Sequence, residues 1–364
     1  MRSRLPIKPW RAVSAIGLSL IMGYAVVRIF AAGPAAVYLL PSGTLANGAT
    51  VVSNAGAIGG QMVVFGPAAI PTPTPTPTPA PTPTPTPTGN STCPLPAYPS
   101  ASCTGRPSSF SSYSNTVGGY TITTNGAVID NWHITGDLDV KASGVVIKNS
   151  QIDGTVNNEG YAGSSFTITD SSVGPASCDT GGLPSIQGTN FTATRVYLHG
   201  HQDGVDVVGD NVTINDSFLQ PCYQPPSVVG GDGFHSDGVQ DQCSATCSNL
   251  SMTHNTVDAR AFYQGVATGN SALNLGSPAD GLHMRNVTLV SNVFLGGGYS
   301  TALQWDAGNN WIVTNNAWVQ GSWAYGPIDA ASTCSHQSWS GNSIVTVNAS
   351  YGITSTVSAQ GCVN

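Results

Sequence analysis

A short motif recurs along the C-terminal three quarters of this chain and limits what the chain can fold into. An apolar residue is followed three positions later, in most copies, by Asn or Ser, and two positions after that by another apolar residue. Successive copies are 18, 21, 25, 21, 38, 37, 24 and 26 residues apart. The copies begin at Ile129, Ile147, Ile168, Ala193, Ile214, Met252, Leu289, Val313 and Trp339. Because one copy is too short to bury its own apolar face, we expect the copies to stack on one another.

Within each copy the apolar residues alternate with other residues at a period of two, which is the side-chain period of a β-strand and not of a helix. We therefore predict a solenoid of short strands. Its polar positions should form ladders that hydrogen-bond from coil to coil, about 4.8 Å apart. The ladder candidates are Ser150, Ser171, Ser217, Asn255, Asn292, Asn316 and Asn342. His254 and Arg195 occupy the adjacent position, and we interpret both as turn residues.

The ladders and the repeat over residues 120–350 resemble the right-handed parallel β-helix of the pectate-lyase-like superfamily. The segment His235–Gln240 is also similar to the H-x-D-G-[VI]-Q coil of exported bacterial β-helix repeat proteins. The resemblance implies an all-β fold, a single-stranded right-handed parallel β-helix of about nine coils. By analogy of fold alone, it also implies a polysaccharide ligand lying along an outer groove of a parallel sheet.

Charge is scarce and unevenly placed. Charged residues make up 8% of the chain, and all 18 acidic residues follow position 129. Six Lys or Arg residues follow position 92, which leaves a net charge of about −12 on this part of the chain. Nucleic-acid binding requires a basic surface, so we exclude a nucleic-acid partner. A polyanionic substrate is disfavoured unless metal ions bridge it to the protein.

The N-terminal part differs in composition from the repeats. Residues 1–36 have a basic start and an apolar run, and predict a signal peptide or a membrane anchor. Residues 37–70 are small, apolar and Gly-rich, and we assign them no structure. Residues 71–92 form a Pro-Thr linker, whose 18-residue core would extend roughly 55 Å as polyproline II. We expect a secreted or cell-surface protein, a monomer, with the β-helix domain over residues 93–364.

Eight cysteines all follow position 92, and an even number in an exported chain favours disulfides. The spacings fit no standard zinc site. We predict the pairs Cys93–Cys103, Cys243–Cys247 and Cys334–Cys362, which leaves Cys178–Cys222. The loop between Cys243 and Cys247 is also expected to supply the extra length of the 38-residue coil.

The pentad H-x-D-G-V occurs twice, at His201–Val205 and at His235–Val239. Aligned on the repeat, four segments should lie on one strand of successive coils: DGVDV at 203–207, DGVQD at 237–241, DGLHM at 280–284 and TALQW at 301–305. Their central side chains should alternate, with an inward apolar row. The outward polar row would comprise Asp206, Gln240, His283 and Gln304.

The doubled pentad would bring two His and three Asp side chains together. Carboxylates this close raise one another's pKa, so that one can stay protonated beside an ionised partner. Such a pair is what an inverting glycoside hydrolase requires. The stretch around Asp237 is similar to the Asn-Thr-Asp-Gly motif of polygalacturonase-like hydrolases, which implies that Asp237 is a catalytic carboxylate. The Asp-Asp pair that follows this motif in that family has no counterpart here.

We therefore predict a glycoside hydrolase acting on a polysaccharide, with Asp237 as one catalytic carboxylate and Asp203 or Asp206 as its partner. His201 and His235 would orient or tune these groups. The residues expected to bind sugar are Gln240, His283, Gln304, Trp305, Asp280 and Arg285.

Two alternatives remain open. A polysaccharide lyase or uronate epimerase would use His201 or His235 as base and Arg285, or Ca²⁺ held by clustered Asp side chains such as Asp280, to neutralise the substrate carboxylate. A non-catalytic carbohydrate-binding surface protein would use exposed tryptophans such as Trp305 to stack on sugars. Trp311, Trp318 and Trp339 stand at inward positions of the repeat, so we expect these three in the core. The hydrolase needs no cofactor, and we assign no metal site.

Overall fold

The structure is a computed structural model that describes residues 49–53, 61–65 and 93–363, except 232, 261, 264–265, 268, 276–283, 304–309, 331–333 and 335–336. The chain divides into two compact units, Met1–Thr84 and Pro85–Asn364. In the first unit, β1 (Ala49–Ser53) and β2 (Gln61–Phe65) pair as an antiparallel hairpin. This hairpin lies in the segment to which the sequence assigned no structure.

The predicted signal peptide or anchor (1–36) and the Pro-Thr linker (71–92) lie outside the described residues, so both stay predictions. None of the helices among the described residues is long and apolar enough to cross a membrane.

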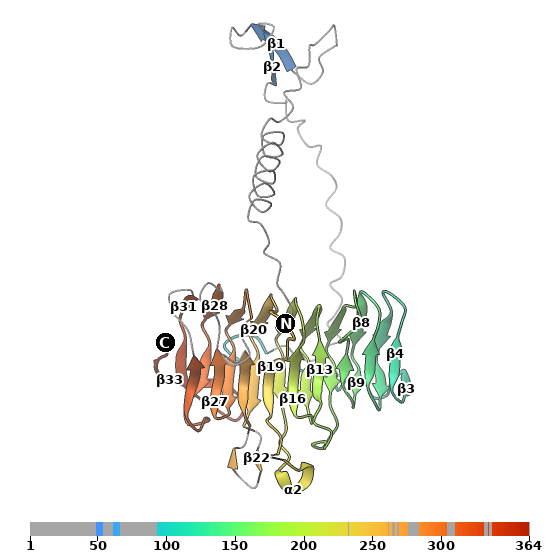
Figure 1. Cartoon of the computed structure of the whole chain (residues 1–364), viewed down its shortest axis with the longest axis vertical. Helices are drawn as coiled ribbons and strands as arrows, with labels where there is room; N and C mark the ends of the chain where they lie inside the picture. The colour runs from blue at the N-terminus through green and yellow to red at the C-terminus, as the bar shows by residue number, and fades with distance from the viewer. Residues whose placement is uncertain are drawn as a thin grey trace, which may run out of the picture. The chain divides into compact units, whose positions relative to one another are not determined.

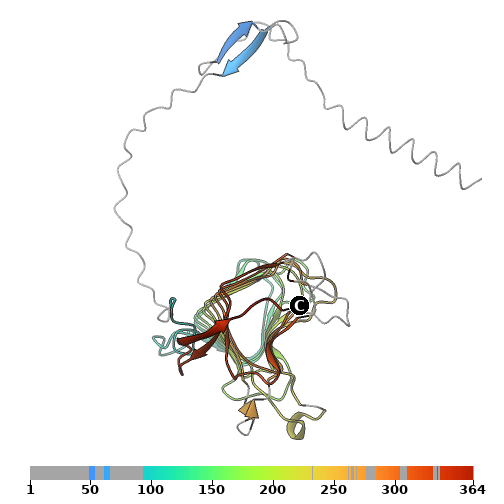
Figure 2. The ribbon, with the colours of Figure 1, turned by 90° about the vertical axis from the view of Figure 1, so that its left-hand side faces the viewer.

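The second unit is a parallel β-helix (Figure 1). Each coil contributes one strand to each of three sheets, and viewed along the axis the coils stack around a common interior (Figure 2). The described part of the chain has nine strands in each of two sheets and 11 in the third. The predicted all-β fold, a parallel β-helix of about nine coils, is confirmed.

In all three sheets the strands lie side by side in chain order. Sheet 1 contains β4 (Tyr120–Ile122), β7 (Leu138–Val140), β10 (Val156–Asn157), β13 (Pro184–Gly188), β16 (Asp203–Val207), β19 (Asp237–Asp241), β24 (Ser271–Leu275), β27 (Tyr299–Leu303) and β30 (Gly326–Ala330). Sheet 2 contains β5 (Val128–Asp130), β8 (Val145–Lys148), β11 (Phe166–Thr169), β14 (Phe191–Thr194), β17 (Val212–Asn215), β20 (Leu250–Thr253), β25 (Thr288–Val290), β28 (Trp311–Thr314) and β31 (Gln337–Ser340). Sheet 3 contains β3 (Asn115–Val117), β6 (Trp132–Ile134), β9 (Gln151–Ile152), β12 (Ser172–Val173), β15 (Tyr197–His199), β18 (Phe218–Gln220), β21 (Thr256–Ala259), β26 (Val293–Gly296), β29 (Ala317–Val319), β32 (Ser343–Val347) and β33 (Ile353–Ala359).

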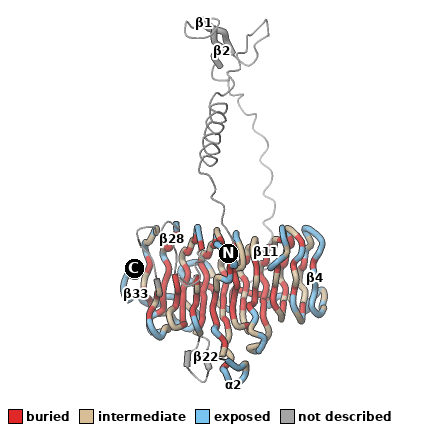
Figure 3. Tube along the Cα trace, in the orientation of Figure 1, coloured by how far each residue is buried: buried red, intermediate tan, exposed pale blue. Residues whose placement is uncertain are grey.

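The core fills the inside of the coils, as Figure 3 shows by the buried residues along the strands. Equivalent side chains of successive coils stack on one another because the parallel strands are in register. Phe166 and Phe191, for example, are register partners with ring centroids 5.0 Å apart. Trp311 and Trp318 are also buried, in agreement with their predicted inward positions.

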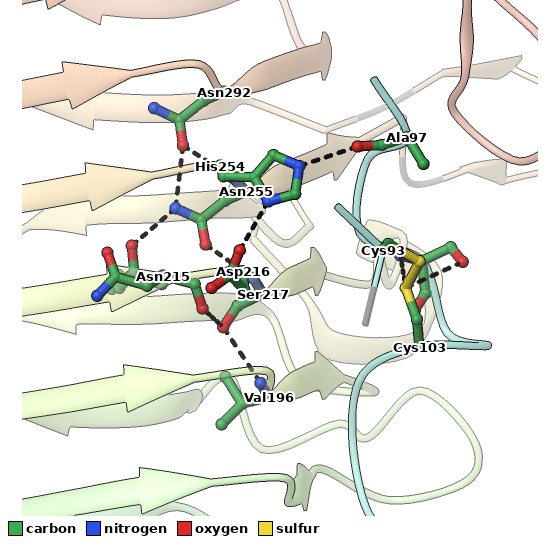
Figure 4. A network of polar contacts seen from close by, with 12 residues as sticks. Cys93, Ala97, Cys103, Val196, Asn215, Asp216, Ser217, His254, Asn255 and Asn292 are labelled. Atoms are coloured by element: carbon green, nitrogen blue, oxygen red, sulfur yellow. Dashed lines mark hydrogen bonds and ion pairs between the residues drawn. A yellow bond between two sulfur atoms is a disulfide. The ribbon is translucent and has the colours of Figure 1, made fainter. Parts of the chain in front are cut away.

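The predicted asparagine ladder is present. Asn255, Asn292 and Asn316 each accept a hydrogen bond at Oδ1 from the backbone N–H of the coil before, at 2.9–3.0 Å. Each side-chain NH2 group donates to a backbone carbonyl, at 2.8–2.9 Å. Part of this ladder is drawn in Figure 4, where Ser217 continues it toward the earlier coils. The ladder satisfies buried turn amides that no sheet pairing reaches.

The turn position beside the ladder has the left-handed conformation. His254 and Arg195 have φ of 54° and 52°. Asn149, Asp170 and Asp216, which directly precede the ladder position in other coils, also have positive φ. Both were predicted as turn residues, and this is confirmed. His254 donates from Nε2 to Ala97 O at 2.9 Å and from Nδ1 to Asp216 Oδ1 at 2.7 Å, so it joins the N-terminal segment of the unit to the coils (Figure 4).

The structure contains all four predicted disulfides, Cys93–Cys103, Cys178–Cys222, Cys243–Cys247 and Cys334–Cys362. Four disulfides indicate an oxidising environment.

Three long connections lead from sheet 3 to sheet 1, at residues 174–183, 221–236 and 260–270. They carry the short helix α2 (Pro226–Val229) and the two-stranded hairpin of β22 (Phe262–Tyr263) and β23 (Val266–Ala267). Most of the extra length of the 38-residue coil therefore lies before β19, and the expectation that the Cys243–Cys247 loop supplies it was wrong. All three connections enter sheet 1 at the same end of its strands.

Candidate functional site

The two pentads lie in adjacent coils, as predicted. Strands β16 and β19 pair in parallel with Val205 opposite Val239 and Asp206 opposite Gln240. The outward row of sheet 1 continues through Gln187 on one side and Asn274 on the other.

The rest of the predicted row is wrong. In sheet 1 the strand that pairs with β19 on its far side is β24 (Ser271–Leu275). The hairpin of β22 and β23 lies in the connection that precedes β24. Residues 280–284 follow β24 in the sequence and precede β25. Asn274 thus holds the place expected for His283. Asp280 and His283 themselves lie outside the described residues.

The fourth predicted segment, TALQW at 301–305, is displaced by two residues from its expected register in sheet 1. Strand β27 pairs with β24 so that Thr301 lies opposite Leu273 and Ala302 opposite Asn274. Ala302 therefore takes the place expected for Gln304. Alternation alone did not fix this register, because it tolerates a slip of two residues. Gln304 and Trp305 lie outside the described residues.

The glycine of each pentad lies against the core. A Cβ atom on Gly204 would lie 3.3 Å from Leu219 Cδ2, and one on Gly238 would lie 2.1 Å from Val257 Cγ1. Leu219 and Val257 are core side chains of sheet 3, so both glycines face the interior. The aspartates at 203 and 237 instead form hydrogen bonds with polar side chains that reach the surface, the partly exposed Gln202 and the exposed Asn270.

Asp203 is a buried carboxyl at the start of β16, with 3% of its surface exposed. Its Oδ1 accepts a hydrogen bond from the backbone N–H of Asp237 at 2.6 Å, and its Oδ2 accepts one from Gln202 Nε2 at 3.2 Å. Burial raises the pKa of Asp203 to about 9, and the charges of Asp206 and Asp237 add to the effect. Asp203 is therefore protonated at neutral pH.

Asp237 lies one coil further on and has no exposed surface. Burial raises its pKa to about 7, although hydrogen bonds from the side chains of Asn270 and Asn274 act in the opposite direction. Asn270 Nδ2 lies 3.1 Å and 3.0 Å from the two carboxyl oxygens. This carboxyl is enclosed by protein donors, so it is placed to influence its neighbours rather than to touch a ligand.

Asp206 keeps 7% of its surface exposed, more than the other two carboxyls. Its Oδ1 is buried and has no hydrogen-bond partner. Burial raises the pKa of Asp206 to about 7, and the negative charge of Glu159 contributes. Glu159 is held by Gln187, whose Nε2 donates to it at 2.7 Å. An unpartnered buried oxygen next to two protonatable carboxyls is costly unless it serves a purpose.

The two histidines of the pentads have different surroundings. His201 is buried, and its Nδ1 lies 2.5 Å from Asp179 Oδ2, while its Nε2 has no partner. His235 is exposed. Although the two pentads share four of their five residues, they do not place their histidines alike, because the 221–236 connection leads into the second pentad and a three-residue turn into the first.

Arg285, a predicted sugar-binding residue, is exposed and forms an isolated bridge with Ser248, ahead of sheet 2. It is not grouped with the carboxyls of sheet 1.

Among the described residues, the ligand atoms of Asp241, Cys243 and Cys247 form the group of three within 4.8 Å of one another that a metal would require. Both of these cysteines are in a disulfide, so the group does not fit a metal. The carboxyls of Asp203, Asp206 and Asp237 do not form such a group.

Sequence reasoning missed Asn270, Asn274, Gln187, Glu159 and Asp179. None of them lies in a pentad, and each reaches the site from another coil or from a connection. The register of the coils was needed to find them.

We found no match to this chain among models of known protein families, among curated proteins or among solved structures.

Proposed function

We propose that this protein is an extracellular glycoside hydrolase that cleaves a polysaccharide on the outer face of sheet 1, with a β-helix of the right-handed, pectate-lyase-like kind. One observation carries the proposal. Three carboxyl groups gather where the long connections enter sheet 1, and their environments separate their pKa values, about 9 for Asp203 against about 7 for Asp206 and Asp237. Two carboxyls of different pKa supply an acid and a base.

The roles follow from exposure and protonation. Asp203, which holds its proton at neutral pH, is the general acid and gives that proton to the glycosidic oxygen as the bond to the anomeric carbon breaks. Asp206, as carboxylate, takes a proton from a water molecule whose oxygen bonds to the same carbon. Asp237 is a positioning residue, since it has no exposed surface and its backbone N–H holds Asp203.

The surroundings favour a neutral polysaccharide. Asp206 and Glu159 are acidic, and the row beside them carries the amides of Gln187, Gln240 and Asn274. Amides donate and accept hydrogen bonds with sugar hydroxyls without attracting charge. A uronate chain would be repelled in the absence of a bridging cation.

The test is a panel of neutral and uronic polysaccharides incubated with the full chain, with Ca²⁺ or with EDTA. Reducing ends and the ultraviolet absorbance of unsaturated products are measured together. We expect reducing ends without unsaturated products, unaffected by EDTA. Asp206→Asn and Asp203→Asn should each lower the rate by about 10²–10⁴. Asp139→Asn, on strand β7 of the same sheet, is the matched control and should keep full activity.

Each other outcome favours an alternative. Unsaturated products that depend on Ca²⁺ would replace the hydrolase with a lyase. Retention on an immobilised glycan without turnover of any substrate would leave a binding module. Equal activity of the wild type and Asp206→Asn would remove Asp206 from the mechanism.

A further inference from the structure

A second polar pocket lies on the outer face of sheet 3, apart from the three carboxyls of sheet 1. It has a volume of about 390 Å³. Its floor comes from the outward side chains of β15, β18 and β21, and the Cys178–Cys222 disulfide lines one side. Tyr351, from the turn between β32 and β33, closes another side. Pockets of this size, toward the small end for ligand sites, suit a single small molecule.

The floor is partly aromatic. The ring of Tyr197 stacks on that of His199, with centroids 4.3 Å apart, and on that of Phe218, with centroids 5.3 Å apart. Tyr351 packs against Phe218 as well, at 5.1 Å. Phe218 is buried beneath these rings and does not line the pocket. It holds the lining rings of Tyr197 and Tyr351 in place, so they give a rigid surface at little cost in side-chain entropy on binding.

The polar groups of the pocket hold each other in place. Arg260 donates from Nε to Asp258 Oδ1 at 2.8 Å and from its NH2 nitrogen to Asp258 Oδ2 at 2.7 Å. The Tyr351 hydroxyl donates to the same carboxylate at 2.9 Å. On the neighbouring strand the Tyr197 hydroxyl donates to Gln220 Oε1 at 2.8 Å. This hydrogen bond does not use the amide NH2 group of Gln220, which also lines the pocket. Fixed donors and acceptors of this kind orient a polar ligand.

The charges in the pocket cancel. The carboxylate of Asp258 is paired with the guanidinium of Arg260. Burial lowers the pKa of His199 to about 4, and the nearby His201 adds to the effect, so the imidazole is neutral at physiological pH. The pocket thus combines an apolar surface, several fixed hydrogen-bonding groups and no net charge.

We infer that this pocket binds one neutral hexose unit, free or at the end of a glycan chain. A pyranose has an apolar face of C–H groups, which matches the aromatic floor, and a rim of hydroxyls, which matches Gln220, Asp258 and Arg260. The cancelled charges give no preference for a uronate. The inference does not rest on the proposed hydrolysis, because binding at this pocket requires none of the sheet 1 carboxyls.

The test measures binding of glucose, galactose, mannose and galacturonate to the full chain by saturation-transfer NMR and by calorimetric titration. We expect one of the neutral hexoses to bind with a stoichiometry of one, and galacturonate to bind more weakly. Gln220→Ala removes an amide that would bind a sugar hydroxyl, and Tyr351→Phe removes the hydroxyl that holds the Asp258 carboxylate in position for one. Each should weaken binding about fivefold, the effect of one lost or misplaced hydrogen bond.

Gln151→Ala is the matched control, because Gln151 is a partly exposed glutamine of the same sheet that does not line the pocket. It should change affinity less than twofold. Thermal unfolding checks that each variant is folded. If Gln220→Ala is not folded, the affinity of Tyr351→Phe alone tests the inference. The inference is overturned if no neutral hexose binds at tens of millimolar, if galacturonate binds more tightly, or if both pocket variants bind like the control.

Discussion

At the scale of single residues, the pentads are explained by what lies on each side of the strand. The glycine lies against the core of sheet 3, and the aspartate before it is buried among polar hydrogen-bond partners. Burial raises the pKa of Asp203 to about 9 and that of Asp237 to about 7, which makes both stability and catalysis sensitive to pH.

Replacing Asp203 by Asn should change how stability depends on pH. The pKa of Asp203 is raised from 3.8 to about 9, so the folded state binds a proton that the unfolded chain has lost over this range. The stability it contributes is complete below pH 4 and falls as pH rises toward 9, by about 1.4 kcal/mol per pH unit. Asp203→Asn stays neutral and should lack this loss. Urea unfolding at pH 5 and pH 8 checks the difference, and parallel curves for the two proteins would contradict it.

The rate of hydrolysis should follow a bell-shaped pH profile. Activity requires Asp206 ionised and Asp203 protonated, so it should rise through pH 7 and fall near pH 9. Initial rates on the best polysaccharide of the panel, from pH 5 to pH 10, measure this. A rate that falls continuously from pH 5 upward would show that Asp203 and Asp206 are not the acid and the base proposed here.

The glycine of the second pentad should not tolerate a side chain. A methyl group at Gly238 would meet Val257 Cγ1 at 2.1 Å and the backbone oxygen of Ala272 at 2.3 Å. Gly238→Ala should therefore destabilise the protein by about 1–3 kcal/mol or more. Gly118→Ala is the control, since nothing lies within 4 Å of its added methyl group. Denaturant unfolding compares the two, and equal midpoints would show that Gly238 does not face the core.

At the scale of elements, two asparagine ladders run along the coils. The predicted ladder is buried in the turn between sheets 2 and 3. A second ladder, which the sequence pattern did not reveal, links Asn190, Asn211, Asn249 and Asn286 through their side-chain amides at 2.8–3.1 Å. The second ladder is largely exposed to water, so each of its hydrogen bonds replaces one to solvent and contributes little.

The two ladders should differ in what they contribute to stability. Asn292→Ala removes an acceptor and a donor from a site with no exposed surface and takes these hydrogen bonds from two backbone groups of the preceding coil, the N–H of Asn255 and the carbonyl of Met252, at a cost of about 3–5 kcal/mol. Asn286→Gly, which keeps the positive φ of 53°, should cost less than about 1 kcal/mol. Equilibrium unfolding measures both, and a similar loss in each would contradict the role of burial.

At the scale of the whole molecule, the coils provide a regular frame, and departures from it create the sites. Asn270, at the end of the 260–270 connection, donates to Asp237, and Cys178–Cys222 joins the other two long connections. The same disulfide lines the pocket on sheet 3. One covalent link therefore bears on both proposed sites.

Removal of this disulfide should affect stability and both sites. The Cys178→Ser, Cys222→Ser double variant lacks the disulfide between residues 44 positions apart. In the chain-entropy model a disulfide of this span stabilises the fold by about 4 kcal/mol, which the variant should lose. The control is Cys243→Ser, Cys247→Ser, which opens a link of four residues and should cost less. Thermal unfolding, polysaccharide hydrolysis and hexose binding are measured for both. A larger effect of the control would show that the long connections do not depend on the disulfide.

The sequence by itself determined the regular part of this protein. The period of two in short segments, the spacing of the copies and the Asn and Ser columns predicted parallel coils, the inward tryptophans, the turn residues and, with the spacing of eight cysteines, the disulfides. These are local properties repeated along one axis, so a pattern in one dimension suffices to find them.

The tertiary structure decided which residues meet at the sites. The register beyond β19 depends on where a coil holds its insertion, and the pattern gave no measure of that, so His283 and Gln304 were assigned to places that Asn274 and Ala302 hold. Likewise, two pentads that match at four of five positions have one buried and one exposed histidine, because burial depends on the connections that lead into them. Side chains from distant coils come together through packing, and a repeat pattern carries no information on that.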